Sequence, residues 1–167
     1  MIDSGLEKVI AFGGIMRRKD KAIHDRDEIE TIIRESLVCH LALSDDNLPY
    51  VVPLCFGYED NTLYFHAATE GRKVNILKKN ANVCFEFTID HEVVQDERPC
   101  RWSMKYRSVI GFGKGSLLEN PQEKKKGLDA IMKHYSGRSF EYVEPAIESI
   151  VIIKVEIESM TGKKSGF

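Results

Sequence analysis

The chain has 167 residues, which is enough for one domain that builds its own hydrophobic core. Hydrophobic residues make up 43% and charged residues 30%, and the formal net charge is -2 with a pI near 6.2. This balance excludes a nucleic-acid binder, which would be strongly basic, and no apolar run approaches the roughly 18 residues that span a bilayer. We therefore expect a cytoplasmic globular protein whose partners include neither nucleic acid nor a membrane.

The first fifteen residues are expected to stand apart from the rest. They lack the basic start and the long apolar stretch of a signal peptide. Met16 is followed by a charged run, Arg17 to Asp20, that suits a natural start. We expect residues 1–15 to be an N-terminal extension or leader and residues 16–167 to form a single domain.

The chain has four cysteines, and none of them forms a C-x-x-C pair: Cys39, Cys55, Cys84 and Cys100. The first three lie in apolar stretches, which is typical of small buried residues in a reducing cytoplasm. Structural zinc sites usually show their ligands as close pairs, so we expect neither a metal site nor a disulfide framework.

The first half of the chain predicts a helix and three strands. Apolar residues at helical spacing predict the helix over residues 27–36, with acidic residues at the front, where the helix dipole favours them. The strands are predicted over residues 37–44, 49–59 and 62–67, separated by the turn signals Asp45-Asp46-Asn47 and Asp60-Asn61. In the first strand, alternation places four apolar side chains on one face: Leu37, Cys39, Leu41 and Leu43.

The second half alternates helices with strands. A helix is predicted over residues 71–80, a strand over 82–90, a long connection over 91–105 that contains Trp102, and a glycine-rich strand over 106–119. Asn120 caps the next helix and Pro121 suits its first turn. Its predicted buried stripe is Leu128, Ile131, Met132 and Tyr135, whereas Lys124 to Lys126 are expected to be solvated. The last strand covers residues 149–160.

Short turns between neighbouring strands indicate antiparallel pairing. Six strands with helices outside them predict a mainly β fold, a six-stranded antiparallel Greek-key barrel with flanking helices. A parallel doubly wound sheet is the alternative, but the chain has too few strand–helix–strand units for it.

The segment from Tyr64 to Lys73 has the residues best suited to binding a ligand. A predicted strand ends, a turn with Gly71 follows, and a helix begins with two adjacent cations, Arg72 and Lys73. Free backbone N–H groups at a helix start attract anions, and both cations suit phosphate. The alternative is a pair of solvated cations, placed slightly unfavourably against the helix dipole. The residues alone leave both interpretations open.

Two further features lie in predicted strands. Pro53 cannot donate in a β-ladder, so it should lie at an edge, at a bulge or where pairing stops, and backbone groups near it could then meet a ligand. An ordinary edge-strand proline is the more common explanation. Gly111, Gly113 and Gly115 share one face of their strand, so a flat ring, a helix or a second subunit could lie against them. Their spacing is not the dinucleotide-binding fingerprint.

Six segments, taken in order, resemble a known family. They are Met-Arg-Arg-Lys-Asp at 16–20, Pro-Tyr-Val-Val-Pro-Leu at 49–54, Tyr-Phe-His-Ala-Ala at 64–68, Gly-Arg-Lys at 71–73, Tyr-Arg-Ser-Val-Ile-Gly-Phe-Gly at 106–113 and Thr-Gly-Lys at 161–163. This set is similar to the nitroimidazole-reductase-like, FMN-binding branch of the pyridoxamine 5'-phosphate oxidase superfamily. The resemblance implies an FMN-binding split barrel that works as a homodimer, with two FMN sites at the dimer interface.

The resemblance also implies roles for individual residues. Arg72 and Lys73, directly after Gly71, match the pair that holds the FMN phosphate. The other implied cofactor-binding residues are Val52, Pro53 and Leu54, whose backbone faces the flavin ring; His66, Ala67 and Ala68, at the strand end that lines the site; and Arg107, Ser108 and Val109, which help to complete the pocket from the same or the partner subunit.

The activity that the resemblance implies is that of an FMN-dependent oxidoreductase. It would reduce a small-molecule acceptor such as a nitroaromatic with electrons from NAD(P)H. His66 is the candidate catalytic residue, as a proton donor or as a ring-stacking neighbour of the substrate, and the connection over residues 91–105 is expected to cover the pocket. The alternatives are a non-enzymatic FMN- or haem-binding module and a pyridoxamine 5'-phosphate oxidase-like enzyme. The second is disfavoured because residues 161–167 do not match the arginine-bearing end of those oxidases.

Overall fold

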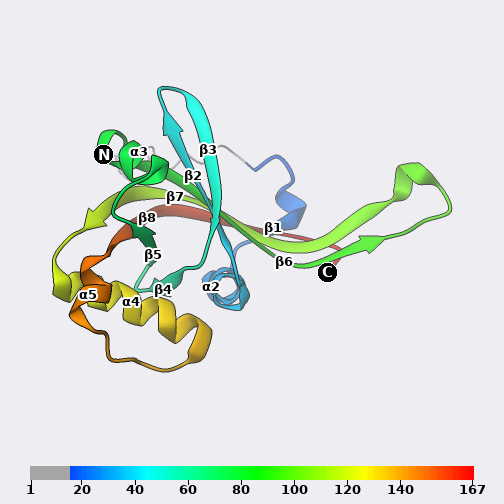
Figure 1. The fold of residues 1–167 in the computed structure, drawn as a ribbon. Helices are drawn as coiled ribbons and strands as arrows, with labels where there is room; N and C mark the ends of the chain where they lie inside the picture. The colour runs from blue at the N-terminus through cyan, green and yellow to red at the C-terminus, as the bar shows by residue number, and fades with distance from the viewer. Residues whose placement is uncertain (1–15) are drawn as a thin grey trace, which may run out of the picture.

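A computed structural model describes residues 16–167 and shows one curved antiparallel sheet with helices packed around it (Figure 1). The expected N-terminal extension, residues 1–15, lies outside the described residues. The strands are β1 (Ala22–Ile23), β2 (Cys39–Asp45), β3 (Leu48–Leu54), β4 (Gly57–Glu59), β5 (Thr62–Ala68), β6 (Asn82–Val94), β7 (Ser103–Leu118) and β8 (Ile150–Ser165). Their order in the sheet is β3-β2-β6-β7-β8-β5-β4, and β1 pairs with β8 outside this path. The predicted mainly β, antiparallel class is confirmed, with eight strands where six were expected.

The helices are α2 (Arg26–Glu35), α3 (Arg72–Lys79), α4 (Pro121–Ser136) and α5 (Glu144–Glu148), with the 3-10 turns η1 (Lys19–Lys21) and η2 (Pro99–Arg101). Two of the longer helices begin at capping side chains. The carboxylate of Asp25 accepts from the Asp27 N–H at α2, and the Asn120 side chain accepts from the first-turn amides at α4. Within residues 16–167, no helix is long and apolar enough to cross a membrane.

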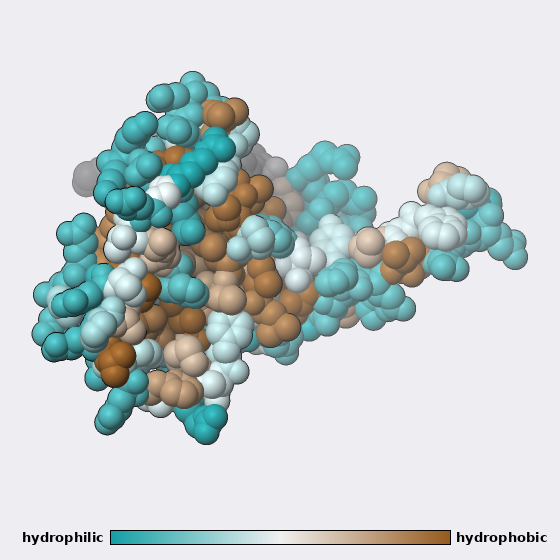
Figure 2. Space-filling view, in the orientation of Figure 1, coloured by the Kyte–Doolittle hydropathy of each residue, from teal (hydrophilic) through white to brown (hydrophobic). Residues whose placement is uncertain are grey.

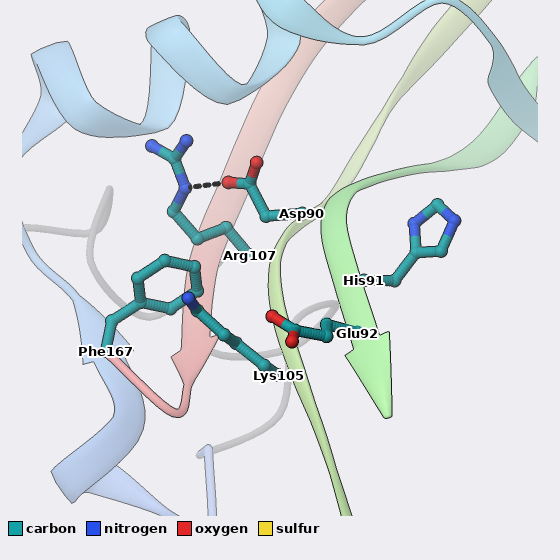
Figure 3. Close-up of a pocket in the computed structure, with 6 residues that line it drawn as sticks. All are labelled: Asp90, His91, Glu92, Lys105, Arg107 and Phe167. Atoms are coloured by element: carbon teal, nitrogen blue, oxygen red, sulfur yellow. Dashed lines mark hydrogen bonds and ion pairs between the residues drawn. The ribbon is translucent and has the colours of Figure 1, made fainter. Parts of the chain in front are cut away.

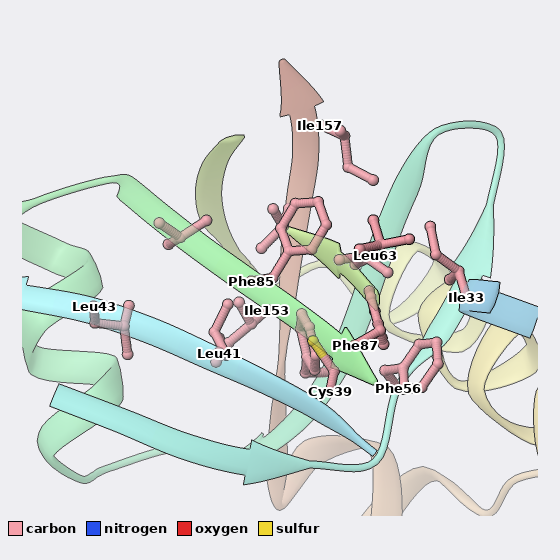
Figure 4. Packing of buried hydrophobic residues seen from close by; sticks show 14 of the residues in the cluster. Ile33, Cys39, Leu41, Leu43, Phe56, Leu63, Phe85, Phe87, Ile153 and Ile157 are labelled. Atoms are coloured by element: carbon pink, nitrogen blue, oxygen red, sulfur yellow. The ribbon is translucent and has the colours of Figure 1, made fainter. Parts of the chain in front are cut away.

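One hydrophobic core fills the inside of the curved sheet (Figure 4). It contains Cys39, Leu41 and Leu43 from β2, as the alternation predicted, together with residues of β5, β6 and β8. The Phe87 ring packs against Phe56 and Phe85, with centroids 4.8 Å and 5.8 Å away. Each such pair contributes about 0.5–1.5 kcal/mol beyond the burial of its area. The prediction that Leu37 and Cys55 are buried was wrong. Leu37 precedes β2 and is 72% exposed, and Cys55 is exposed between β3 and β4.

The glycine face of β7 points into this core, so neither a ligand nor a second subunit lies against it. A Cβ on Gly111 would come within 2.1 Å of the Phe85 ring, and one on Gly115 within 2.7 Å of Leu77 of α3. A Cβ on Gly113 would lie 2.3 Å from the Glu156 carbonyl oxygen of the neighbouring strand. The expectation of a ligand or subunit contact is therefore wrong, and of the three alternatives only the helix is found.

The buried stripe of α4 also differs from the predicted one. Its buried residues are Lys124, Gly127, Ala130 and Ile131. The helix lies close against the sheet at Gly127, where a Cβ would lie 2.7 Å from the Ile152 side chain. Because a glycine carries no hydrophobic signal, the apolar pattern gave the wrong phase. Lys124, expected in solvent, donates from its ammonium to the carbonyl oxygens of Ile147 (3.2 Å) and Ile150 (2.6 Å).

Both ends of the predicted long connection over residues 91–105 are strand, residues 91–94 in β6 and residues 103–105 in β7. β6 and β7 continue as a two-stranded ribbon that pairs Glu92–Val94 with Ser103–Lys105, beyond a register shift after Ile89. This ribbon, which we call the arm, extends away from the rest of the molecule (Figure 1). Trp102 lies at its end, 52% exposed. Alternation in the arm is short and mixed with charged residues, so the sequence pattern indicated a loop.

Candidate functional site

β3 and β4 are consecutive strands of the chain, but they pair with different neighbours. The three residues of β4 pair with Thr62–Tyr64 of β5, whereas β3 pairs only with β2. Beyond Tyr64, the remaining residues of β5 pair only with β8. The sheet is therefore open between the edge of β3 and residues 65–68 of β5, and we call this opening the split. Pro53 lies on the edge strand β3, one of the positions that its missing N–H predicted.

Each end of the split is closed by contacts within the chain. At one end, Cys55 and Phe56 carry the chain from β3 into β4. At the other end, α3 begins directly after β5, and the guanidinium carbon of Arg72 lies 4.6 Å from the centroid of the Tyr50 ring on β3. On the face shown in Figure 2, apolar residues gather between the β2–β3 hairpin at the top and α4 at the bottom.

The start of α3 has the features of an anion site. Gly71 precedes it with φ 137° and ψ 169°, a conformation that glycine adopts readily and other residues do not. Among residues 16–167, no side chain caps this helix, and no acidic residue lies in its first turn. Within this part of the chain the first amides of α3 therefore have no capping partner, and the charges beside them, Arg72 and Lys73, are both positive. This combination favours phosphate or another anion.

The structure brings three of the four predicted segments to the split. Val52 and Leu54 of β3 pack inward against the core, and Pro53 is exposed on the outer face. On β5, Ala67 is buried, while His66 and Ala68 are exposed. Gly71 and Arg72 are exposed at the helix start, and Lys73 is half-buried. Residues 52–54, 66–68 and 71–73 therefore border one opening.

The fourth segment, residues 107–109, lies elsewhere in the same protomer. β7 is separated from β3 by β2 and β6 in the sheet. Ser108 and Val109 are buried, and the Val109 side chain belongs to the core. Arg107 is therefore the member of this segment whose side chain a ligand can reach.

Arg107 lies in a cluster of charged groups at the base of the arm (Figure 3). Its guanidinium pairs with Asp90 at 2.5 Å and with Glu35 at 3.2 Å. The hydrogen bond with Asp90 raises the pKa of Arg107 above its ordinary value. The cluster borders a cleft of about 370 Å³ that the Phe167 ring and Lys105 also line. Asp90 adopts φ 54° at the register shift of β6, a backbone conformation that non-glycine residues rarely occupy.

A second cleft, of about 570 Å³, adjoins this cluster and was not foreseen from the sequence. Its walls are Glu35, Leu37, Val38, His40, Pro53, Thr88, Ile89, Asp90 and His91. The His40 ring is held by Glu86, with Nδ1 2.9 Å from the carboxylate. The ladder of β2 and β3 pairs His40 with Pro53, so strand pairing brings these two wall residues together. Glu35, at the end of α2, reaches the cleft through packing that the sequence pattern does not contain.

His40 and His66 lie on different strands of the sheet. His66 lies on β5 opposite Ile152, whereas His40 lies on β2 opposite Glu86. Across residues 16–167, no three His, Cys, Asp or Glu side chains gather in a group that could hold a metal ion. The Cys39 thiol is fully buried, and this burial raises its pKa well above the usual range, which disfavours the thiolate.

A curved antiparallel sheet with an open edge between β3 and β5 and flanking helices defines the class of the protein as a split barrel. The family model of pyridoxamine 5'-phosphate oxidase matches residues 25–164, and the chain belongs to this family. No curated protein sequence matches the chain.

Solved structures agree with this assignment. A candidate 5-nitroimidazole antibiotic resistance protein from Bacteroides thetaiotaomicron VPI-5482 is 40% identical, with 85% of each chain covered and a TM-score of 0.77. The flavocytochrome Anf3 from Azotobacter vinelandii is 18% identical over 92% of this chain and 73% of its own, with a TM-score of 0.79. The FAD and heme binding protein from Mycobacterium smegmatis is 20% identical over 88% and 74%, also at 0.79. The last two show a shared fold alone.

Proposed function

We propose that the protein is a flavin-dependent oxidoreductase that binds FMN with its phosphate at the start of α3. The observation that carries the proposal is the uncapped, cationic helix start beside the split. Arg72 and Lys73 would hold the phosphate together with the first amides of α3. An anion there would also offset the unfavourable position of two cations at the positive end of the helix dipole.

The edges of the split fit the flat part of the cofactor. Residues 52–54 lie on a strand without a second partner, and residues 66–68 lie on the free part of β5. Unpaired N–H and C=O groups on such edges are available to the polar rim of a ring system. When bound, FMN would supply the electron transfer, while the chain's own residues position it and exclude water.

The names of related structures support a reduction reaction. The relative that is 40% identical is named for 5-nitroimidazole resistance, which favours a nitroaromatic acceptor, and we propose NAD(P)H as the electron donor. His66, exposed on β5 at the split, would donate a proton to the acceptor or stack against it. A second candidate, a non-enzymatic flavin- or haem-binding module, is favoured by the likeness in fold to a FAD and heme binding protein.

We also propose that the protein works as a homodimer. Arg107 lies on β7, which β2 and β6 separate from β3 in the sheet, and we propose that it completes the cofactor site of a second copy. The arm extends away from the body and carries exposed apolar side chains: Val93, Val94, Trp102 and Met104. An isolated two-stranded ribbon is marginally stable in water, so contact with a partner would stabilise it. A monomeric mass in solution would contradict this part of the proposal.

The test is an FMN titration of the purified protein, followed by its absorption spectrum. The variant is the double substitution Arg72→Ala, Lys73→Ala. Its matched control, Lys78→Ala, Lys79→Ala, removes the same charge from the other end of α3. We expect the first variant to bind FMN at least about ten-fold more weakly, because charge-assisted hydrogen bonds contribute about 1.5–3 kcal/mol each. The control should bind as the wild type does. No FMN binding by the wild type would reject the proposal.

Reduction of the bound flavin separates the enzyme from the binding module. We expect NADH or NADPH to bleach the flavin absorption, and a 5-nitroimidazole to restore it. A protein that holds FMN but is not reduced by either nicotinamide would favour the binding module.

A further inference from the structure

The contact between Arg72 and Tyr50 joins two elements of the split that are far apart in the barrel's sheet order. Tyr50 lies on β3, which ends one side of the sheet, and Arg72 begins the helix that follows β5. The guanidinium carbon lies 4.6 Å from the centroid of the Tyr50 ring, within the range of a cation–π interaction. The planar guanidinium is well suited to such stacking.

Within residues 16–167, Arg72 has no acidic partner that would neutralise its charge. Among the described residues, no ion pair or side-chain hydrogen bond involves it. Arg107, by contrast, is bound by two carboxylates. The Tyr50 ring contacts the guanidinium without occupying its N–H donors, which remain available for an anion.

Tyr50 can hold Arg72 because it is itself held in place. Tyr50 pairs with Leu43 in the ladder of β2 and β3, and its half-buried ring packs against the hydrophobic core. An exposed arginine on a helix otherwise samples many rotamers, and fixing one of them before binding reduces the entropy lost on binding. The ring therefore acts as a fixed support for one conformation of Arg72.

We infer that Tyr50 is a positioning residue of the phosphate site, acting through Arg72. This inference rests on the proposed FMN function. It assigns Tyr50 a part in distinguishing phosphorylated from unphosphorylated flavin, because Arg72 would contact the phosphate and not the ring system. The aromatic ring is the group required, and the phenol hydroxyl is not.

The experiment titrates FMN and riboflavin into five proteins: the wild type, Tyr50→Phe, Tyr50→Leu, Arg72→Ala and the double variant Tyr50→Leu, Arg72→Ala. We expect Tyr50→Leu to weaken FMN binding about two- to five-fold, the range of an exposed cation–π contact. Riboflavin binding should not change, and Tyr50→Phe should bind both flavins as the wild type does. In the Arg72→Ala background, Tyr50→Leu should cause no further loss, because its effect passes through the arginine.

Three outcomes would overturn the inference. An equal loss of FMN and riboflavin binding in Tyr50→Leu would assign the ring a general structural role. Unchanged FMN binding in Tyr50→Leu, in a wild type that binds FMN, would reject the positioning role and leave the proposed function standing. A wild type that binds no FMN would remove both.

Discussion

The ring of Phe85 lies directly against the backbone of Gly111, where a Cβ would come within 2.1 Å of Phe85 Cζ. It would also lie 2.8 Å from the Ser159 carbonyl oxygen on β8, so the Phe85 side chain and the β8 backbone both leave no room for a methyl group at Gly111. We expect Gly111→Ala to lower the free energy of unfolding by about 1–3 kcal/mol, the usual cost of overpacking a core. Urea denaturation measures this.

A second substitution tests the cause of that loss. In a Gly111→Ala, Phe85→Leu double variant, the smaller side chain leaves space for the new methyl group. We expect the double variant to lose less stability than the sum of the two single changes. Simple additivity would show that Phe85 is not the obstacle.

The glycines of β7 also show what a sequence pattern can and cannot determine. Alternation correctly placed Gly111, Gly113 and Gly115 on one face, because that follows from backbone geometry alone. What covers the face depends on the register that pairs Phe85 of β6 with Gly111 and on the packing that places Leu77 of α3 against Gly115. Residue spacing along one strand does not contain that information.

Lys124 offers a prediction with a matched control one residue away. Its buried ammonium donates to two carbonyl oxygens, at Ile147 and Ile150, and so joins α4 to the start of β8. Lys124→Met would leave both carbonyls without this donor, and we expect a loss of about 1.5–3 kcal/mol in the free energy of unfolding. Lys125 is exposed, so Lys125→Met should stay within about 0.5 kcal/mol of the wild type. Equal effects in urea denaturation would refute the buried role of Lys124.

Gly71→Ala tests the backbone conformation at the start of α3 without adding a steric clash. A Cβ at Gly71 would meet nothing within 4 Å, so the cost arises from φ 137° alone, about 1–3 kcal/mol. Because the change would also reorient the first amides of α3, we expect weaker FMN binding. Gly137→Ala is the control, since it likewise has a positive φ and open space but lies after α4. It should lower the melting temperature and leave FMN affinity unchanged.

His66→Asn tests the proposed role of the exposed histidine on β5. If His66 donates a proton to the acceptor, turnover should fall at least about 100-fold, the lower range for general acid catalysis. FMN affinity should change little, because residues 66–68 are proposed to meet the flavin through backbone N–H and C=O groups, which the substitution keeps. The assay follows NAD(P)H oxidation with a 5-nitroimidazole as acceptor. His24→Asn, at an exposed position before α2, is the control, and equal turnover in both variants would remove His66 from the mechanism.

The candidate site could be predicted only where its signals are local. Gly71, Arg72 and Lys73 are adjacent, and Pro53 indicates an edge through its own missing N–H, so each could be identified without a fold. The contact of Tyr50 with Arg72 is not local, because it exists only after β3 and the start of α3 meet across the split. The same holds for Leu37 and Val38, whose exposure depends on where β2 begins.

Tyr135 gives a prediction at alkaline pH. Its hydroxyl donates to the Leu37 carbonyl at 2.8 Å and accepts from the Phe56 N–H at 3.1 Å. Burial raises the pKa of Tyr135 to about 12, from an ordinary value of 10.0. Between these values the folded protein keeps a proton that the unfolded chain has lost, so stability falls as pH rises from 10 to 12. Tyr135→Phe should reduce that decline and cost about 1–2 kcal/mol at pH 7, where both hydrogen bonds are lost.

The control for Tyr135 is Tyr142→Phe. Burial also raises the pKa of Tyr142 to about 12, so this variant should reduce the same alkaline decline. Its hydroxyl lies beside the Asp129 carboxylate, which also contributes to the raised pKa, and makes no hydrogen bond to a backbone group among the described residues. Its removal should therefore cost less at pH 7 than removal of the Tyr135 hydroxyl, which has two backbone partners. The measurement is urea denaturation of both variants at pH 7 and at several values above 9. If the two variants have the same stability at pH 7, the Tyr135 hydroxyl does not stabilise the junction between Leu37 and Phe56, and only its titration distinguishes it from a phenylalanine.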